Sequence, residues 1–413
     1  MPSEWERITL GKALAFSNGR TSPERSQSGA FSVFGSNGRI GRGHEHNAPR
    51  DTIVIGRVGS YCGSVHFSDE PCWVTDNAIR AEALPGNDPY FLFSLLRLLD
   101  LNRWRAGSGQ PLLNQTILSS IVIHVPRSDI QRAIGCFLKQ LDDRIDLLRQ
   151  TNATLESIAQ ALFKSWFIDF DPVRAKAEGR EPQGMDAATA ALFPSTFEES
   201  ELGLIPKGWR VDAIGNVTNC VGGGTPSTKE PAYWFPEQHH WATPKDLSGL
   251  GSPVLLDTDR RLSDAGLAKV SSGLLPVGTL LMSSRAPIGY LAIAQVPLAI
   301  NQGFIAMLPG DVLPPEFLYF WCQANMDGIK QKANGSTFME ISKAAFRPIA
   351  LAVPSQAVAA RFSAMAETIF QRIATGEQQS RQLAELRDTL LPRLISGKLR
   401  ISDAQETVQG AIA

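Results

Sequence analysis

Short glycine-rich loops carry the side chains of this chain that are best suited to chemistry on a polyanion. Residues 35–44 read GSNGRIGRGH, and residues 51–67 add a second basic position after a buried strand pattern. Glycine lets a backbone approach a ligand closely. Arginine binds phosphate or the edge of guanine, and asparagine pairs with adenine. In the first half of the chain we therefore expect nucleic-acid contacts from Ser36, Asn37, Arg39, Arg42, His44 and Arg57.

The second half holds comparable loops, TPSTK at 225–229, WATPKD at 241–246 and SSR at 283–285. Asn77, Asn301 and Gln302 have the amide groups that read adenine. Lysine or arginine also precedes two Gly-Ser pairs, where it could grip phosphate. The expected contacts here are Thr225, Ser227, Lys229, Lys245, Ser284, Arg285 and Gln302, with Arg103, Arg105, Lys330 and Lys332 before the Gly-Ser pairs. A solvated turn is the alternative for each of these loops.

Catalytic and metal motifs are weak. Asn87-Asp88-Pro89-Tyr90 is similar to the N-P-P-Y motif of amino-methyltransferases, but a proline that opens a helix explains it equally well. Gly222-Gly223-Gly224 precedes Thr-Pro rather than a phosphate-binding helix. The pairs His44/His46 and His239/His240 lack further ligands at metal spacing. We expect no catalytic residue, no metal and no cofactor.

An internal repeat organises the chain. Gly107-Ser108 is followed by Val125-Pro126, and Gly335-Ser336 by Val353-Pro354, with each pair displaced by 228 residues. Arg57 falls on Arg285 at the same offset. Trp5 and Trp209 open the two copies at an offset of 204, so the second copy carries about 24 extra residues. The GGGTPS segment of the second copy has no clear equivalent in the first.

Two long helices are predicted, because apolar residues step by alternating fours and threes along 128–166 and again along roughly 356–396. The first seam consists of Ile134, Leu138, Leu141, Ile145, Leu148, Asn152, Leu155, Ala159, Leu162 and Trp166. The second contains Gly376 and Ser380 at its centre and is interrupted by Arg387. We expect the helices to pair antiparallel. An ordinary bundle helix is the alternative.

These patterns divide the chain into six parts. The predicted fold is α+β, with two repeated α/β domains, called head 1 and head 2 below, joined by two long antiparallel coiled-coil-like helices. The expected boundaries are 1–126 for head 1, 127–170 for the first spacer helix, 171–200 for a linker, 201–354 for head 2, 355–400 for the second spacer helix and 401–413 for a frayed tail.

Composition limits the possible functions. The net charge of −1 means that nucleic-acid binding needs local basic patches or a partner that supplies positive charge. No apolar run is long enough to cross a membrane, and the N-terminus lacks a signal pattern. The five cysteines form no C-x-x-C pair, which favours reduced thiols. We expect a cytoplasmic protein.

Taken together, these segments resemble the specificity subunit of a Type I restriction–modification enzyme. The resemblance rests on FKSWFIDFDPVRAKAEG (163–179), LIPKGWRVDAIGNV (204–217), LPRLISGKL (391–399) and the loop motifs of both heads. It implies two target-recognition domains that each read half of a gapped DNA sequence, and a helical spacer that sets the gap.

The resemblance also implies partners. These are double-stranded DNA, two modification subunits that methylate adenine, and restriction subunits with nuclease and translocase activity. The chain itself would not be an enzyme. Two alternatives remain: a helical scaffold that presents two protein-binding heads, and half of a split DNA methyltransferase.

Overall fold

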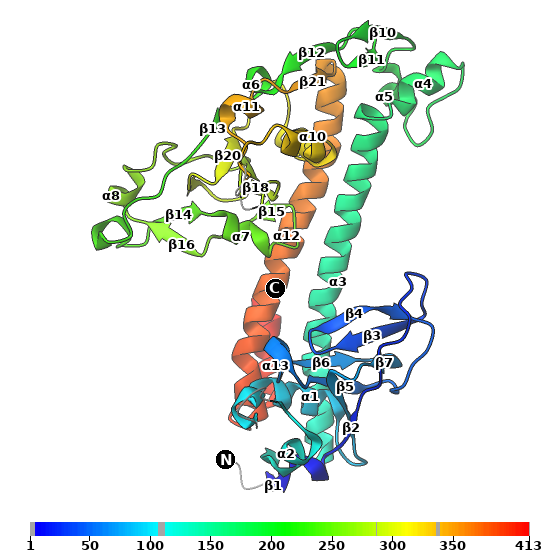
Figure 1. Cartoon of the computed structure of the whole chain (residues 1–413), viewed down its shortest axis with the longest axis vertical. Coiled ribbons are helices and arrows are strands. Elements are labelled where there is room, and N and C mark those ends of the chain that lie inside the picture. Colours follow the sequence, from blue (N-terminus) through cyan, green and yellow to red (C-terminus); the bar gives the residue numbers. More distant parts are fainter. Residues whose placement is uncertain (1–4, 106–111, 286, 336–338, 413) are drawn as a thin grey trace. The chain divides into compact units, whose positions relative to one another are not determined.

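The protein forms two compact units, each with a head and parts of both long helices (Figure 1). The computed structural model describes residues 5–105, 112–285, 287–335 and 339–412. Unit 1 comprises residues 1–146 and 379–413, and unit 2 comprises residues 147–378. The Gly107-Ser108 pair and Ser336 of the second pair lie outside the described residues. Each unit is described by itself below.

Head 1 is built from small sheets. The four-stranded sheet has the order β2 (Leu14–Asn18), β8 (Ala78–Ala83), β5 (Thr52–Gly56), β6 (Val65–Ser68), and the three-stranded sheet has the order β4 (Gly38–Gly43), β3 (Phe31–Gly35), β7 (Cys72–Val74). β1 (Glu6–Thr9) pairs with β9 (Val122–Val125), and all pairs are antiparallel except β3–β7. The helical elements are η1 (Leu10–Lys12), η2 (Gly59–Tyr61), α1 (Pro89–Leu98), η3 (Leu101–Trp104) and α2 (Gln115–Ser120). The β-branched run in β5 is buried throughout, as its continuous apolar pattern predicts.

Head 2 repeats this topology. Its larger sheet has the order β13 (Cys220–Val221), β20 (Phe304–Met307), β17 (Leu280–Ser283), β18 (Leu291–Ala294), β15 (Val254–Leu255), and its smaller sheet has the order β16 (Arg260–Leu262), β14 (His239–Ala242), β19 (Leu298–Ile300). β12 (Arg210–Ala213) pairs with β21 (Ala350–Val353), and β14–β19 is parallel like β3–β7. The helical elements are α6 (Ile214–Val217), η4 (Pro231–Tyr233), α7 (Pro244–Ser248), α8 (Asp264–Leu267), α9 (Pro315–Ala324), α10 (Met326–Gln331) and α11 (Lys343–Phe346). The repeat inferred from sequence is therefore a repeat of fold.

Much of the extra length of head 2 lies in one connection. In head 1, β3 and β4 are joined by Ser36 and Asn37 alone. The equivalent strands of head 2, β14 and β16, are joined by residues 243–259, which contain α7 and the additional edge strand β15. The two heads thus share a scaffold and differ in a loop that the scaffold presents.

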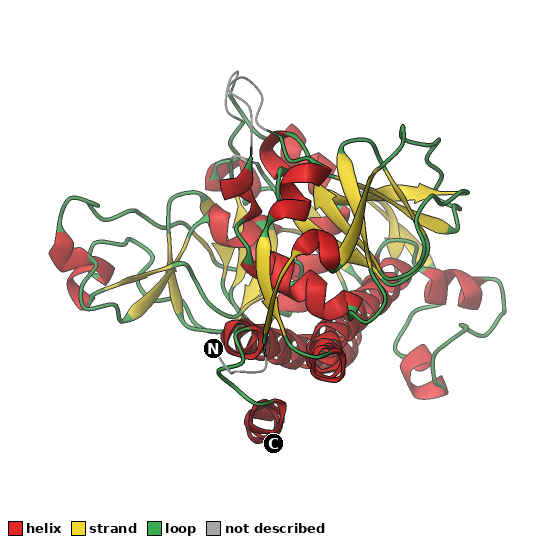
Figure 2. Ribbon diagram, turned by 90° about the horizontal axis from the view of Figure 1, so that it is seen from below, coloured by secondary structure: helices red, strands yellow, loops and turns green. Residues whose placement is uncertain are grey.

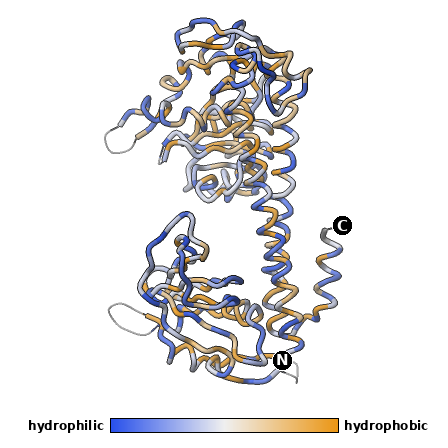
Figure 3. Tube along the Cα trace, turned by 90° about the vertical axis from the view of Figure 1, so that its right-hand side faces the viewer, coloured by the Kyte–Doolittle hydropathy of each residue, from blue (hydrophilic) through white to orange (hydrophobic). Residues whose placement is uncertain are grey.

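The long helices are α3 (Ser128–Phe167) and α12 (Gln356–Ile395), in agreement with the predicted bounds. Within each unit their segments run side by side and antiparallel (Figures 1 and 2). Figure 3 shows hydrophobic and hydrophilic residues mixed along both helices, as an amphipathic pair requires. The seam prediction is confirmed. Its buried members are Ile134, Leu138, Leu141, Ile145, Leu148, Asn152, Ala159 and Trp166 on α3, and Phe362, Ala366, Ile373, Ser380, Leu383 and Leu390 on α12.

The polar residue of the α3 seam, Asn152, packs against a glycine of α12, Gly376. The Asn152 Nδ2 atom donates to the Ile373 carbonyl at 3.2 Å, and the Asn152 side chain is almost fully buried. A Cβ added to Gly376 would lie 2.5 Å from the Asn152 Oδ1 atom. Gly376 therefore leaves the space that Asn152 occupies. A buried asparagine in a helical seam favours one register over others.

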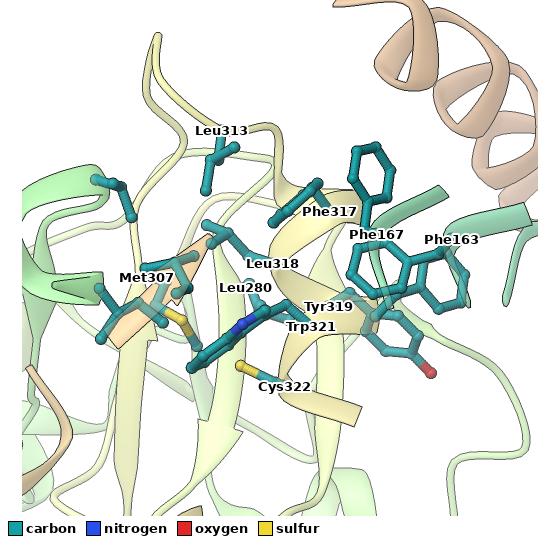
Figure 4. Packing of buried hydrophobic residues seen from close by; sticks show 14 of the residues in the cluster. Phe163, Phe167, Leu280, Met307, Leu313, Phe317, Leu318, Tyr319, Trp321 and Cys322 are labelled. Carbon is teal, nitrogen blue, oxygen red and sulfur yellow. The ribbon is translucent and has the colours of Figure 1, made fainter. Parts of the chain in front are cut away.

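Aromatic side chains anchor head 2 to the helices of its own unit. Phe163 and Phe167 of α3 pack on Phe317 of α9 with ring centroids 5.1 and 4.8 Å apart (Figure 4). Phe362 of α12 lies 5.1 Å from Phe167. Such contacts explain why the sequence needs the FKSWF run at the end of the first helix.

The segment 171–200, predicted to be a linker, is folded against unit 2. It contains α4 (Asp171–Ala177), α5 (Ala187–Ala191) and β10 (Phe197–Ser200), which pairs with β11 (Gly203–Pro206). Phe193 packs on Trp166 at 5.0 Å, and Arg361 of α12 bonds to Asp186 and Thr189. Prolines and glycines here make turns between short elements rather than a flexible connection.

The tail, predicted to be frayed, forms α13 (Ile401–Ile412). Ile401, Ala404 and Val408 recur one helical turn apart, and Ala404 and Val408 are buried. The prediction of a frayed tail was wrong, because three apolar residues one helical turn apart already indicate a short amphipathic helix.

Candidate nucleic-acid interface

Four loops of head 1 join into one surface, here called loop edge 1: residues 36–39, 56–64, 75–78 and 101–105. The Ser36 hydroxyl donates to the Asn77 carbonyl, and the Arg57 amide donates to the same carbonyl at 3.0 Å. The Ser64 hydroxyl donates to the Ser36 carbonyl. A Cβ added to Gly63 would lie 3.1 Å from the Asn102 backbone nitrogen. These contacts hold four separate chain segments together.

Several predicted residues are exposed on loop edge 1. Asn37 and Arg39 are exposed, and Arg39 makes no side-chain hydrogen bond or ion pair within the described part of the chain. The side chain of Arg103 is 81% exposed and bonds Asp100 at 3.0 Å. Arg105 is exposed and donates to the Asn102 carbonyl. Free amide and guanidinium groups of this kind can bind bases or phosphates.

Two other predicted residues are not part of loop edge 1. Arg42 donates from Nε to the Gly29 carbonyl at 2.6 Å and from a terminal nitrogen to the Ala30 carbonyl at 2.7 Å. Its guanidinium therefore fastens the loop before β3. His44 follows the opposite end of β4 from the Ser36–Asn37 turn. It lines a hollow of about 510 Å³ with Arg20, Thr21, Pro23, Glu24, Glu45 and Trp73.

Arg57 does not share its structural position with Arg285. The Arg57 amide donates to the Asn77 carbonyl, and its carbonyl accepts from Leu113. In head 2 it is Ser284 whose amide donates to the Gly303 carbonyl at 2.8 Å and whose carbonyl accepts from Ile341 at 3.0 Å. Arg57 thus corresponds to Ser284, at an offset of 227. The pairing read from the sequence is wrong by one residue because connections between β5 and Leu113 differ in length from their counterparts: the offset is 227 at Arg57, 226 at Gly63 and 228 at Leu113.

Head 2 has a corresponding surface, loop edge 2: residues 224–227, 284–285, 287–290, 301–303 and 326–334. Of these, 224–227 corresponds to residues 20–23 of head 1 and not to the Ser36–Asn37 turn. The Thr225 hydroxyl donates to the Gln302 Oε1 atom at 2.6 Å, and both residues are exposed. Gly303 joins this group through the Ser284 amide. Lys330 and Lys332 are exposed at and just beyond the end of α10. The fold therefore brings Thr225 and Gln302 into contact. A Cβ added to Gly289 would lie 2.6 Å from the Met326 sulfur, so the segment that carries Lys330 and Lys332 lies beside residues 287–290.

The other predicted residues of head 2 differ in availability. Ser284 is 3% exposed, so its side chain is not accessible. Lys245 bonds Asp259 at 3.0 Å, and this hydrogen bond raises the pKa of Lys245. Arg285 lies 3.9 Å from Glu340. Ser227 and Lys229 are exposed in the segment that precedes η4.

The GGGTPS segment does have an equivalent in head 1, contrary to the sequence reading. A Cβ on Gly19 would lie 2.0 Å from the Thr75 carbonyl oxygen, and one on Gly223 would lie 1.8 Å from that of Ile300. Gly19 and Gly223 are separated by the same 204 residues as Trp5 and Trp209. Both positions need glycine because the backbone passes against another strand.

An indole fastens this segment in each head. The Trp73 Nε1 atom of β7 donates to the Thr21 carbonyl at 3.2 Å, and the Trp241 Nε1 atom of β14 donates to the Gly224 carbonyl at 3.1 Å. The tryptophans come from different strands of the smaller sheet. The same loop is therefore held in both heads by different residues, which the sequence comparison had no means to detect.

His66 supports the turn of loop edge 1. A Cβ on Gly38 would lie 2.9 Å from its ring, and its Nε2 atom is 3.2 Å from the Ser64 hydroxyl. Burial lowers the pKa of His66, opposed by a hydrogen bond to the Ser36 backbone. The neutral imidazole is therefore the form that fits this site.

Two exposed aromatic residues of loop edge 1 are not among the contacts predicted from the sequence. Tyr61 is 52% exposed and Trp104 is 43% exposed. Trp104 lies between Arg103 and Arg105, and this basic and aromatic triplet is the sequence pattern from which a nucleic-acid contact of Trp104 could have been predicted. Tyr61 stands between glycines with no such neighbours, so the sequence offered no signal for it.

Catalytic and metal chemistry find no support in the described ranges. Asp88 caps α1 by accepting from the Phe91 amide at 2.8 Å, which explains the Asn-Asp-Pro-Tyr segment as a helix start. No three His, Cys, Asp or Glu side chains gather there as metal ligands. The five cysteines form no disulfide among the described residues. No helix among the described residues combines the length and apolar character needed to cross a membrane.

Comparison with known families gives a match over most of the chain. Residues 2–157 and 206–375 match the family described as the Type I restriction modification DNA specificity domain. The two matched segments correspond to the two copies of the repeat.

Individual relatives agree with this match. The chain is 28% identical over 367 residues to the Type I restriction enzyme HindI specificity subunit of Haemophilus influenzae, covering 75% of this chain and 77% of that one. It is 36% identical over 165 residues to the MjaIX specificity subunit of Methanocaldococcus jannaschii, covering 40% and 38%. The crystal structure of the Type I restriction–modification S subunit from M. genitalium has a TM-score of 0.62 at 17% identity, and the match covers 94% of this chain and 96% of that one.

Proposed function

Because this chain belongs to the Type I restriction–modification DNA specificity family, we propose that each of its heads reads one half of a gapped, asymmetric DNA target. The spacer helices α3 and α12 set the gap between the halves. Loop edge 1 and loop edge 2 are the surfaces that contact the DNA. The chain acts in the cytoplasm, where the DNA is.

The observation that carries this proposal is the repeated scaffold with unlike loop edges. The equivalent strands have the same order in both heads, yet the two loop edges expose different side chains. Loop edge 1 exposes Asn37, Arg39, Arg103 and Arg105, whereas loop edge 2 exposes Thr225, Gln302, Lys330 and Lys332. Different donors and acceptors read different bases. The two half-sites should therefore differ in sequence.

The modest charge of the chain indicates shared binding. The net charge is −1, and non-specific affinity for DNA comes mainly from phosphate neutralisation. We propose that two modification subunits supply further positive surface and all of the methyl-transfer chemistry. Restriction subunits would join the same complex. The chain itself orients these partners and is not catalytic.

The proposed exchangeable parts follow the predicted boundaries. Residues 1–126 and 201–354 are the target-recognition domains, and 127–170 and 355–400 are the spacer helices. The segments 171–200 and 401–413 complete units 2 and 1 as short folded elements. Loop variation on a fixed scaffold allows one head to change without refolding the other.

Head exchange tests the proposal. Residues 1–126 are replaced by the corresponding head of another family member, and the methylated motif of the host genome is sequenced before and after. One half-site should change while the other half and the gap remain. If both halves change, the heads are not independent readers. The reciprocal exchange of 201–354 is the matched control and should change the other half.

Two further measurements separate the alternatives. A gel shift with and without modification subunits distinguishes a DNA reader from a scaffold, because a scaffold gives no sequence preference in either case. Incubation of the purified chain with DNA and S-adenosylmethionine tests the split-methyltransferase reading. Methyl transfer by the chain alone would contradict the non-catalytic role.

A further inference from the structure

Loop edge 1 exposes two large aromatic rings on loops that contact each other. Tyr61 ends η2 and is 52% exposed, and Trp104 ends η3 and is 43% exposed. The two loops meet where Gly63 passes Asn102, two residues from each ring in sequence. Exposing two such rings on one edge costs hydrophobic free energy unless a partner covers them.

Several arginine residues belong to the loops that carry the two rings or to the turn beside them. Arg57, Arg103 and Arg105 belong to the same loops, and Arg39 lies on the adjoining turn. Asp76 and Asp100 are the acidic residues of these loops, and Asp100 is already bonded to Arg103. The Nε atom of Arg57 is buried and has no hydrogen-bond acceptor among the described residues. Aromatic rings with surplus arginine on one face favour a polyanion that also offers flat bases.

Head 2 lacks these rings at the corresponding places. Gly63 corresponds to Gly289, because the Gly63 amide donates to Gly56 as the Gly289 amide donates to Ser283. Counting from that pair, Pro287 stands in place of Tyr61. The segment 326–334, which follows α9 as residues 101–105 follow α1, contains no aromatic residue. The aromatic pair is therefore a property of head 1 alone.

We infer that Tyr61 and Trp104 stack on bases of the half-site read by head 1 and unstack one base step there. This inference rests on the proposed function and deepens it. Arg103 and Arg105 bind the flanking phosphates, and the rings occupy the space opened between bases. Apolar and aromatic wedges unstack duplex steps in this way from the minor groove. Head 2, with proline in place of Tyr61 and no aromatic residue in 326–334, leaves its half-site stacked.

The inference assigns a source of specificity that needs no hydrogen bond to a base edge. Unstacking costs least at flexible pyrimidine–purine steps. Head 1 should therefore prefer such a step in its half-site, in addition to the bases read by Asn37 and Arg39.

The test uses the complex of the full chain with its modification subunits and the DNA motif found by methylome sequencing. 2-Aminopurine is placed in turn at each purine position of both half-sites other than the methylated adenines and their neighbours, because the modification subunits unstack these when they flip the target base. Its fluorescence reports unstacking. The wild-type complex should raise the fluorescence at one step of the head 1 half-site and nowhere in the head 2 half-site. The double variant Tyr61→Ala/Trp104→Ala should abolish that rise and weaken cognate binding about 5- to 150-fold.

Matched variants separate stacking from charge. Tyr61→Phe and Trp104→Phe retain a ring and should retain the fluorescence rise. The double alanine variant removes no cation, so the slope of log affinity against log salt should stay unchanged. Lys332→Ala, on the segment of head 2 that follows α9, should reduce that slope by about one and leave the 2-aminopurine signal alone.

Two outcomes would overturn the inference. The first is an unchanged affinity and fluorescence rise in the double alanine variant. The second is loss of modification subunits from that variant while DNA within the assembled complexes remains unstacked, which would make the rings a protein-docking surface. Failure of the wild-type complex to prefer cognate over scrambled DNA would instead contradict the proposed function.

Discussion

Arg387 of α12 donates to the carboxylate of Asp142 on α3, inside unit 1. Their side chains are 14% and 19% exposed. The Tyr90 hydroxyl of α1 donates to the same carboxylate at 2.6 Å, and Arg97 lies 3.9 Å from it. Burial and the neighbouring Asp142 charge raise the pKa of Tyr90, so its hydroxyl remains a donor. This cluster ties head 1 to both helices.

The repeat makes this cluster informative. At the 228-residue offset Asp142 corresponds to Phe370 and Arg387 to Ala159, and both of these are buried in the apolar cluster of unit 2. One half of the spacer therefore carries a charged pair where the other carries an apolar pair. Arg387 interrupts the predicted seam. Its side chain stays mostly buried because it pairs with Asp142, and it does not turn out to solvent.

Removing one charge of this pair should destabilise the protein. Arg387→Ala leaves the Asp142 carboxylate half-paired in a mostly buried site, which should cost about 2–4 kcal/mol. Adding Asp142→Phe matches the apolar pair of unit 2, and Tyr90→Phe removes the hydroxyl that would lose its acceptor, so the triple variant should recover most of the loss. The measurement is urea unfolding of the full chain followed by circular dichroism.

An exposed ion pair provides the control for this experiment. Lys164 and Asp169 are 64% and 40% exposed. Lys164→Ala should change the unfolding free energy by no more than about 1 kcal/mol. If Arg387→Ala is equally mild, the buried cluster has no structural importance.

Gly376 and Asn152 should show strong coupling. Glycine to alanine in a helix normally stabilises by about 1 kcal/mol. At position 376, however, the added Cβ would meet the Asn152 Oδ1 atom, so the Asn152 side chain must move and its Nδ2 atom loses the hydrogen bond to the Ile373 carbonyl. We expect Gly376→Ala to destabilise the wild type but to stabilise the Asn152→Ala variant, measured as a double-mutant cycle of unfolding free energies.

Gly410 of α13 is the matched glycine, because nothing lies within 4 Å of a Cβ added there. Gly410→Ala should be neutral or stabilising in both backgrounds. Equal effects of Gly376→Ala with and without Asn152 would show that the two residues do not pin the register.

The helices and the repeat were predictable because their signals are periodic. A seam that alternates fours and threes over 33 residues, from Ile134 to Trp166, survives single exceptions such as Asn152. The short strand–turn–strand units were also readable, since β5 is a continuous apolar run between turns. The predictions for the tail and for the linker were wrong for the opposite reason, because the apolar stripes of these segments are only two turns long or shorter.

The site was predictable in part. The exposure of Arg39 and Gln302 was predictable because their loops are short and polar, and their contact with DNA stays a prediction. Ser284 was misjudged because one residue of turn length decides whether a side chain faces the core or the solvent. The equivalence of Gly19 and Gly223 was missed because close backbone approach depends on a distant strand. Such contacts cannot be read from local composition.

Arg39 and Arg57 should affect DNA binding differently. Arg39 is exposed and free of intramolecular bonds within the described residues, so Arg39→Ala should cost about 1–3 kcal/mol on cognate DNA and relax specificity. Arg57 has a buried Nε atom without an acceptor in the described part of the chain, beside exposed cations. Arg57→Ala should weaken binding to all sequences and reduce the salt slope by about one.

Binding isotherms at several salt concentrations, on cognate and scrambled DNA with modification subunits present, measure both effects. Arg42→Ala is the control, since the Arg42 guanidinium is engaged with the Gly29 and Ala30 carbonyls. Arg42→Ala should lower the free energy of unfolding and have little effect on the slope of log affinity against log salt. Equal weakening of both DNAs by Arg39→Ala would mean that Arg39 contacts phosphate.

Acid should loosen loop edge 1 through His66. Burial lowers the pKa of His66 below its ordinary 6.5, so the unfolded chain takes up the proton first. The stabilising effect of the neutral imidazole is therefore complete above pH 6.5 and is lost as the pH falls through the lowered pKa of the folded state. His66→Gln should flatten the decline in unfolding free energy between neutral and acidic pH.

Two other histidines complete that experiment. His44→Gln, at an exposed position, should retain the wild-type pH dependence. Burial also lowers the pKa of His240 in head 2, with Arg261 adding to the effect, so His66→Gln/His240→Gln should be flatter still. An undiminished pH dependence in the His66 variant would contradict its assigned role in supporting the turn.

The spacer prediction concerns the gap between half-sites. One heptad is inserted in the middle of α3 and another in the middle of α12, which keeps both seams in phase. Seven residues add about 10 Å of helix, close to three base pairs at about 3.4 Å each. The methylated motif should therefore keep both half-site sequences and gain about three base pairs of gap.

A four-residue insertion in each helix is the matched control. Four residues shift the seam out of phase and locally unwind a coiled coil, so this variant should lose stability and methylation instead of lengthening the gap. The heptad variant must fold as well as the wild type, measured by urea unfolding, before its motif is read. An unchanged gap in a folded heptad variant would mean that α3 and α12 do not set the distance between half-sites.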